Sequence, residues 1–439
     1  MKKVTVMLAL VALVGNIANA ELLKNFKADG QIEVNAYSVN NKDFNKKASD
    51  KTANTDTRIM INAGFDLNED VNAVVSAVKL NRQYGTGSEN ISYGTGAGGG
   101  IFDNVFFQQA YLNLKNVLGI DHKLGRQYYG DKGDMVIYYG PATMPYTAKF
   151  TPSIAAIDGW TGWYKFTALN RDWNLNAIIA KQVMGTTYPS RDINVSGINA
   201  KTNVDRWNLN AYVYQKVDQN NAVRTDYLDV VGARANWECM FVKNLNLGLE
   251  YDRNMGKNLT ASHLVAPDNI NYKHQGYAYK VNADYGMDLA GKLGFMGQYY
   301  FASGDKKANA ADTAFKAINS DYRPGIINGG GYTGTITNAG TGSVIYGLGA
   351  NWTPEKLTKL NIAANYYNFS YAEKKVVTVP TTRTTNMGNE SDLVLTWTHS
   401  DNVNVKGYYA MFQPEKKNLA VNAKHDAETM MGAAFNVKF

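Results

Sequence analysis

The closing stretch AAFNVKF, residues 433–439, alternates apolar and polar side chains and ends on the aromatic Phe439. Alternation with a period of two is typical of a β-strand that has one apolar and one polar face. A last strand of this kind, ending in an aromatic residue, is typical of a bacterial outer-membrane β-barrel. The C-terminal stretch therefore predicts an all-β fold that crosses a membrane with strands.

The N-terminus supports the same interpretation. Lys2 and Lys3 precede an apolar run at residues 4–14, and Ala18-Asn19-Ala20 stands just before Glu21. A basic start, an apolar centre and a small-residue cleavage site are typical of a secretory signal peptide. We expect residues 1–20 to be removed on export and residues 21–439 to form one barrel domain. No cysteine stands at the cleavage site, so we expect no lipoprotein anchor.

The composition agrees with many strands and excludes several classes of protein. The chain has 40 Gly, 29 Tyr and 7 Trp but only 9 Pro, and Cys239 is its single cysteine, which excludes an internal disulfide. No apolar stretch after Ala20 approaches the ~20 residues of a spanning helix. The net charge of +7 is not clustered in a basic stripe. We therefore expect no nucleic-acid partner.

The period of two can be followed along almost the whole mature chain, and it predicts about 18 strands, an even number as single-chain barrels require. The weakest of these segments is 188–202, in which residues 193–200 alternate, and leaving it out would give an odd count. We expect strands at about residues 31–37, 58–65, 71–84, 106–114, 120–128, 160–168, 173–182, 193–202, 207–216, 227–237, 245–251, 277–286, 292–302, 344–352, 360–369, 392–399, 403–412 and 428–439.

Short and long connections alternate between these strands. Tight polar turns, such as Asn170-Arg171-Asp172, belong at the periplasmic end of an outer-membrane barrel, and long loops belong at the extracellular end. We expect long loops at residues 38–55, 85–100, 131–158, 254–275, 303–342 and 371–388. The first strand begins too soon after Glu21 to leave room for an N-terminal plug domain, which favours a water-filled channel over a larger energised transporter.

Three segments resemble recurring blocks of the alginate export family of outer-membrane barrels. They are LGRQYYGD at 124–131, YYFASGD at 299–305 with Phe315 downstream, and NESDLVLT at 389–396. The resemblance covers nearly all of the mature chain and implies an 18-stranded barrel, whose best-known relatives pass an anionic polysaccharide through an arginine-rich constriction. The residues that match the family blocks are Gly125, Arg126, Gln127, Ser303, Gly304, Asp305, Glu390 and Asp392.

Alternation also predicts which charged side chains face the pore. The candidate cations are Arg58, Lys165, Arg206, Lys216, Arg234, Lys280, Lys292 and Lys406, set against Glu33, Glu250, Asp284 and Asp392. Arg126 joins the candidates through the family block, although strict alternation puts it in phase with Leu124, so its direction depends on a bulge or on the end of the strand. The pattern is a cationic bias rather than a dense belt. Each cation has the alternative of being a solvated wall residue with no special role.

The tryptophans divide by phase into two groups. Trp207, Trp237, Trp352 and Trp397 share a phase with apolar neighbours, which predicts an aromatic girdle at the lipid interface. Trp163 shares a phase with Thr161 and Lys165, which places it toward the pore.

No constellation of residues predicts an enzyme. His122, His263, His274, His399 and His425 are scattered, and no nucleophile and base can be paired. The string GTGAGG at 94–99 lacks the strand–helix context of a dinucleotide site. Asp305 and Asp312 match no EF-hand spacing. We predict no catalytic residue, no metal and no cofactor.

These observations predict a channel in the outer membrane of a bacterial cell. It would pass small hydrophilic solutes, anionic solutes or an anionic polysaccharide through a cationic pore with no chemical step. Its partners would be outer-membrane lipid, the solute and, for the export form, a periplasmic secretion partner. The alternative is a structural or surface-interaction barrel whose long loops plug the pore.

Overall fold

The computed structural model describes residues 24–82, 105–141, 156–183, 192–221, 224–258, 272–305, 312–330, 342–378, 381–419 and 424–439. The predicted signal peptide and the predicted loop at 85–100 lie outside these residues. Among the described residues, no helix is long and apolar enough to span a membrane.

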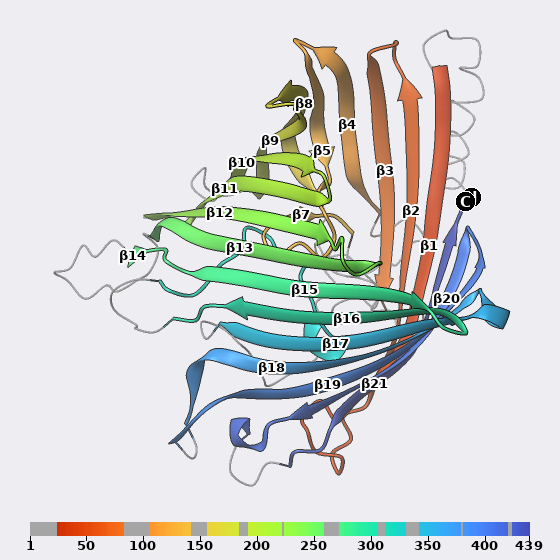
Figure 1. Cartoon of the computed structure of the whole chain (residues 1–439), viewed down its shortest axis with the longest axis vertical. Coiled ribbons are helices and arrows are strands. Elements are labelled where there is room, and N and C mark those ends of the chain that lie inside the picture. The colour runs from red at the N-terminus through yellow and green to blue at the C-terminus, as the bar shows by residue number, and fades with distance from the viewer. Residues whose placement is uncertain are drawn as a thin grey trace, which may run out of the picture.

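One antiparallel sheet dominates the molecule and closes on itself (Figure 1). It contains 19 strands, of which β14 (Tyr272–Lys273) is two residues long, so that 18 longer strands form the barrel wall. The barrel closes where β1 pairs with β21, with Gln31 opposite Lys438 and Asn40 opposite Thr429. In Figure 1 the red β1 meets the blue strands at the right of the view.

The wall strands are β1 (Lys24–Asn40), β2 (Thr52–Asp66), β3 (Val71–Arg82), β4 (Val105–Val117), β5 (Ile120–Gln127), β8 (Ile157–Ala168), β9 (Arg171–Val183), β10 (Ile193–Val204), β11 (Trp207–Asn221), β12 (Arg224–Glu238), β13 (Leu245–Asn258), β15 (Tyr277–Asp288), β16 (Gly291–Ala302), β17 (Ser343–Pro354), β18 (Leu360–Thr378), β19 (Thr381–Ser400), β20 (Val403–Pro414) and β21 (Glu428–Lys438). Short 3-10 turns occupy Glu355–Leu357 and Lys416–Asn418.

The predicted strands are confirmed, including the weak one at 193–202, which is β10 and pairs with both β9 and β11. The predicted loop at 371–388 is wrong, because β18 continues to Thr378 and β19 resumes at Thr381. Threonines and valines there pair across the hairpin, for example Val377 with Thr382. Threonine and valine favour a strand. Polar residues can continue a strand where it extends beyond the membrane into water.

Tight turns gather at one end of the barrel. β8 and β9 are joined by Leu169 and Asn170, whose φ angles are 54° and 57°. Two successive positive φ angles make the turn type that matches the twist of a hairpin. The hairpin is confirmed, but its turn begins one residue before the predicted Asn170-Arg171-Asp172, because Arg171 and Asp172 already pair with β8. β1 also begins at this end of the barrel, and β21 finishes there. In an outer-membrane barrel this is the periplasmic end.

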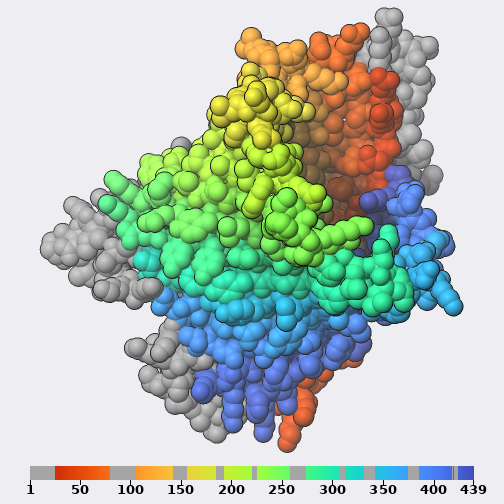
Figure 2. All heavy atoms as spheres, in the orientation of Figure 1, coloured from red at the N-terminus to blue at the C-terminus, as the bar shows by residue number. Residues whose placement is uncertain are grey.

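The outer face of the wall is apolar. Phe107, Ile179 and Leu348 each expose more than 60% of their surface, and Figure 2 shows a continuous wall from the green strands to the blue ones. Trp207, Trp352 and Trp397 also lie on this face, as their phase predicts, and the rings of Trp207 and Trp237 stack 5.5 Å apart. An apolar band with aromatic residues near the turns is what lipid contact requires.

Two segments between strands fold into the lumen. The first inward segment is residues 131–141 and follows β6 (Tyr129–Gly130); it contains β7 (Tyr138–Tyr139), which pairs with β6. The second inward segment is residues 312–330 and ends in α2 (Ile327–Gly330). The two segments pair with each other in parallel, because Tyr138 N–H donates to the Asn319 carbonyl at 2.8 Å and Asn319 N–H donates to that of Val136 at 3.0 Å. Together they narrow the lumen on the side of the long loops.

Candidate pore constriction

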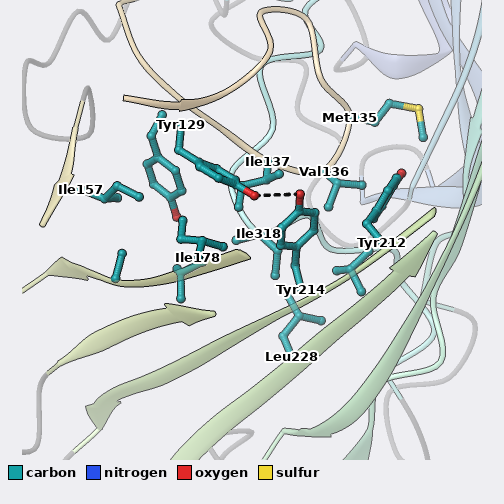
Figure 3. Packing of buried hydrophobic residues seen from close by; sticks show 14 of the residues in the cluster. Tyr129, Met135, Val136, Ile137, Ile157, Ile178, Tyr212, Tyr214, Leu228 and Ile318 are labelled. Carbon is teal, nitrogen blue, oxygen red and sulfur yellow. Dashed lines mark hydrogen bonds between the residues drawn. The ribbon is translucent and has the colours of Figure 1, made fainter. Parts of the chain in front are cut away.

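The first inward segment packs an apolar edge against the lumenal wall (Figure 3). Val136 and Ile137 are buried at 0% and 2% exposure, and they meet wall residues that include Ile178 and Leu228. The hydroxyls of Tyr129 and Tyr214 lie 3.1 Å apart across the contact. This packing places the segment in one position rather than leaving it free in the channel.

A charged network fixes the same segment from its other side. Arg234 of β12 donates through both terminal nitrogens to Asp134, at 2.6 and 2.7 Å, and through Nε to Glu250 at 2.6 Å. Lys280 lies 3.3 Å from Glu250. Asp134 also accepts the N–H groups of Val136 and Ile137. Because the carboxylates of Asp134 and Glu250 are nearly inaccessible to water, Arg234 is the group that makes their burial tolerable.

The second inward segment is held by carboxylates of β19. Glu390 accepts the N–H groups of Ile327 and Asn328 at 2.6 and 2.9 Å, and Asp392 accepts that of Ile326 at 3.3 Å. These are N–H groups at the start of α2, which have no partner within the helix. Glu390 is fully buried, and Gly325 packs so closely that a Cβ would lie 2.7 Å from its Oε2 atom.

A hydrogen-bonded clip holds the start of the second inward segment. Ser303 Oγ accepts the Tyr277 N–H at 2.9 Å and donates to the Thr313 carbonyl at 2.7 Å. The Thr313 hydroxyl lies 2.9 Å from the Gly304 carbonyl and 3.2 Å from Asp305. Ser303, Gly304 and Asp305, which match the family block, therefore anchor an inward segment. Among the described residues, no group of acids, histidines or cysteine could hold a metal ion.

His274 completes this clip. Its ring nitrogens lie 2.6 Å from Asp226 and 3.4 Å from Asp312, and Lys316 contacts Asp312 as well. Burial alone raises the pKa of Asp312, but hydrogen bonds from His274 and Lys316 outweigh it and lower that pKa to about 2. Burial alone lowers the pKa of His274, and the hydrogen bonds to Asp226 and Asp312 reverse this, so that its pKa is raised.

Most of the predicted pore cations lie on the lumenal face. Arg58 contacts Glu33, Lys216 donates to the Ile318 carbonyl at 3.4 Å, and Arg234 and Lys280 belong to the network above. Lys165 and Lys406 share the lumenal phase and have no ion pair within the described part of the chain, and Lys292 is exposed at the start of β16. Glu33, Glu250, Asp284 and Asp392 share this face with them.

Two predicted pore cations do not face the lumen. Arg206 is exposed in the turn between β10 and β11, because β10 ends at Val204. Arg126 lies on the outer face in phase with Leu124, and its Nη1 donates to Asp158 at 2.9 Å. The register of β5 against β8 is regular from Asp121 to Gln127, so no bulge turns Arg126 inward.

The neighbours of Arg126 in the family block serve the wall itself. Gln127 is fully buried and donates to the Gly159 carbonyl at 3.1 Å while accepting from Thr161 at 2.7 Å. Gly125 has a φ of 121°, and a Cβ there would lie 2.3 Å from the Ala110 carbonyl oxygen. The glycine in this block is therefore required for the close approach of β4 and β5.

Sequence reasoning placed Glu33, Glu250, Asp284 and Asp392 on the lumenal face but missed other acidic residues there. The buried carboxylates include Glu33, Asp56, Asp134, Glu250, Asp252, Asp321, Glu390, Asp392 and Glu428, whereas Arg58 is the buried arginine among the described residues. Alternation could have placed Asp252 and Glu428 on the lumenal face. Asp134 and Asp321 lie in irregular segments, where apolar and polar side chains do not alternate. The described lumenal wall is therefore mixed in charge.

Below the inward segments the lumenal wall is rich in amides that lie over glycines. A Cβ at Gly248 would lie 2.3 Å from Asn282 and 2.9 Å from Asn236, whose strands flank it. Gln298 faces Gly347, Asn351 faces Gly294 and Asn365 faces Gly349 in the same way. Because the glycines have no side chain, the amides lie along the wall and present polar edges without closing the channel.

Two cavities open along this wall. The one under the first inward segment has a volume of about 170 Å³ and is lined by Arg234, Asn236, Glu250, Lys280, Asn282 and residues 131–134. The other, of about 460 Å³, lies toward the tight turns, between polar residues of β8 to β11 that include Lys165, Asn174 and Lys201. Both can exchange hydrogen bonds with a hydrophilic solute.

Comparisons with known proteins give a fold but no close relative. No family model matches the sequence, and no curated protein is similar to it, so the resemblance to the alginate export family stays a prediction. Among solved structures, the chain is similar to Acinetobacter baumannii OccAB2, with 10% identity, a TM-score of 0.56 and 96% and 99% of the two chains covered.

Two barrels of Pseudomonas aeruginosa are similar to the same degree. OccK8 (OprE) has 12% identity and a TM-score of 0.55 over 96% and 99% of the chains, and OpdK, solved with vanillate, has 12% identity and 0.54 over 95% and 100%. At this identity the likeness establishes the fold, which is the 18-stranded barrel of outer-membrane porins.

Proposed function

We propose that the chain is a passive channel of the bacterial outer membrane that carries small hydrophilic solutes. The observation that carries this proposal is the contrast between the two faces of the wall: lipid-facing aromatics outside, and amides, ion pairs and polar cavities inside. The two inward segments set the width of the lumen, as loops do in channels that select solutes by size. The porin structures that share the fold agree with this function.

The finer form of the prediction, an anionic solute in a cationic pore, has narrower support. It depends on lumenal lysines such as Lys165 and Lys406, because Arg58, Arg234 and Lys280 each contact carboxylates. OpdK, one of the similar structures, was solved with vanillate, which is an anion. Export of an anionic polysaccharide with a periplasmic secretion partner would need a denser set of free cations than the described wall offers.

A second candidate is favoured by the packing of the inward segments. Each of them joins a buried apolar cluster, one around Ile137 and one around Ile327. Close packing of this kind would also suit a structural barrel whose plugged lumen conducts nothing.

The test is the single-channel conductance of the refolded mature protein in a planar bilayer under a salt gradient. A steady conductance supports the channel, and its absence from correctly folded protein supports the plugged barrel. A reversal potential that shows anion preference, and loses it in the variant with Lys165→Gln and Lys406→Gln, would support the anionic form. A reversal potential near zero would support a channel for uncharged solutes.

A further inference from the structure

The cavity under the first inward segment has a charge balance that identifies the kind of solute it fits. Its ionisable lining residues are Asp131, Asp134, Glu250, Lys132, Arg234 and Lys280. Three are acidic and three are basic, so the lining has no net charge. An anion in this cavity would meet as many carboxylates as cations, and a cation would meet as many cations as carboxylates.

Most of the charged groups also have a partner of opposite charge. Arg234 bonds to Asp134 and Glu250, Lys280 contacts Glu250, and Asp131 contacts Lys201, which is not part of the lining. Arg234 and Lys280 are partly exposed and keep N–H donors that can bond to a hydroxyl group without losing their partners. The cavity therefore offers hydrogen bonds and a lining with no net charge, which disfavours a bare ion and favours a neutral polar molecule.

Two amides extend this surface. Asn236 and Asn282 stand on either side of Gly248, and both are held along the wall because nothing projects from the glycine. An amide offers both donors and acceptors, which matches a hydroxyl group, itself a donor and an acceptor. The volume of about 170 Å³ suits a small ring compound and is too large for a single ion.

We propose that this cavity binds a neutral polyhydroxylated solute of about the size of a monosaccharide, and that the channel admits solutes of this class. The proposal depends on the proposed channel function for its transport step, but not for binding. The amides and the paired charges would each bond to a ring hydroxyl, so that a solute lacking these hydroxyls leaves polar groups unpaired and binds less well.

The first experiment measures equilibrium binding to the refolded full barrel by calorimetry with D-glucose, D-glucuronate and protonated D-glucosamine, which share the six-membered sugar ring and differ mainly in charge. We expect D-glucose to bind at least tenfold more tightly than either ion. Replacing the pocket amides in the variant Asn236→Leu with Asn282→Leu should weaken D-glucose binding by about tenfold, the effect of losing one to two hydrogen bonds. Tighter binding of either ion, or no effect of the pocket variant, would overturn the proposal.

Matched variants separate the site from general effects on the wall. Asn351→Leu with Asn365→Leu removes amides that lie over glycines in the same way but do not line the cavity, and it should leave binding within twofold. Gly248→Ala keeps both pocket amides but displaces them into the cavity, and it should also weaken binding, whereas Gly349→Ala should not. Equal losses in the pocket and control variants would count against the site.

Conductance measured on the same preparations distinguishes the two proposals. A barrel that binds D-glucose but carries no current would support the binding site and contradict the channel function. A barrel that conducts but does not prefer D-glucose would support the channel function and contradict the binding site.

Discussion

The two inward segments lie side by side in the lumen but are anchored by different chemistry. The first is held by a side chain, Arg234, which satisfies two buried carboxylates at once. The second is held through its main chain, because Glu390 accepts two N–H groups from the start of α2. Removal of a charged partner leaves a buried charge uncompensated, whereas removal of an acceptor leaves neutral N–H groups unpaired. The first anchor should therefore be the more costly to lose.

Arg234→Ala tests the first anchor and should have the largest effect. It leaves Asp134 without its bidentate partner and Glu250 with Lys280 as its remaining ion-pair partner, which costs about 3–5 kcal/mol for a buried pair. We expect the first inward segment to leave the wall, so that single-channel conductance rises and becomes noisy while the barrel stays folded.

A double variant shows whether the charge or the packing is responsible. Arg234→Met with Asp134→Asn removes both members of the ion pair, and a buried pair replaced as a whole often costs little. Conductance close to that of the unaltered protein is expected. If the double variant is as noisy as Arg234→Ala, the anchor works through packing of the arginine against Tyr212, whose ring lies 4.8 Å from the guanidinium.

Glu390→Ala tests the second anchor and should have a smaller effect. It leaves the buried N–H group of Ile327 without an acceptor, at about 1–3 kcal/mol, whereas the N–H group of the half-buried Asn328 can bond to water instead. Hydrogen exchange at these two amides should accelerate, while exchange in the first inward segment stays slow. Asp284→Ala, which removes an exposed carboxylate of the lumenal wall, is the matched control and should change neither.

The clip at His274 predicts a pH dependence for the second inward segment alone. Asp312 has a lowered pKa of about 2, so its contribution is present above its ordinary pKa and is lost as pH falls toward 2. His274 has a raised pKa, so its contribution is present below its ordinary value of about 6.5 and is lost as pH rises through the raised one.

Both contributions are present between about pH 4 and 6.5, where we expect the slowest proteolysis of the second inward segment, by a margin of ~1 kcal/mol after screening. His274→Gln should abolish the rise in cleavage above this range. A first inward segment that follows the same pH profile would show that the two anchors are coupled through the backbone pairing of Asn319 with Tyr138.

The strands could be predicted because apolar and polar side chains alternate within each of them. The fold of the connections could not be predicted, because they have no such pattern. Alternation placed Arg234 on the lumenal face, and the family block singled out Glu390, yet neither anchor was visible, since the partners Asp134 and Ile327 lie in irregular segments. The length of the range 303–342 allowed it to fill the lumen, but nothing in its sequence decided which part folds inward. Local sequence does not encode a contact that spans 100 residues, such as that between Asp134 and Arg234.

Cross-strand register was the other missing quantity. Asn236, Gly248 and Asn282 are all in the lumenal phase of their strands, but only the register of β12, β13 and β15 sets the two amides on either side of the glycine. A shift of two residues would preserve every phase and separate them. The candidate cavity therefore could not be predicted from the sequence, although alternation had placed Arg234, Glu250 and Lys280 on the lumenal face.

Arg126→Ala provides the reference for both anchors, because this arginine touches neither inward segment. Its partner is Asp158 on the outer face, and the two side chains expose 36% and 55% of their surfaces. An ion pair of this kind contributes about 0–1 kcal/mol, so unfolding, conductance and reversal potential should all stay close to those of the unaltered protein. A clear loss of anion preference would instead require Arg126 to reach the lumen, against the regular register of β5 with β8. Arg234 lies five strands further along the same wall, in β12, so the contrast between the two arginines depends on which face the side chain occupies and on what lies opposite it.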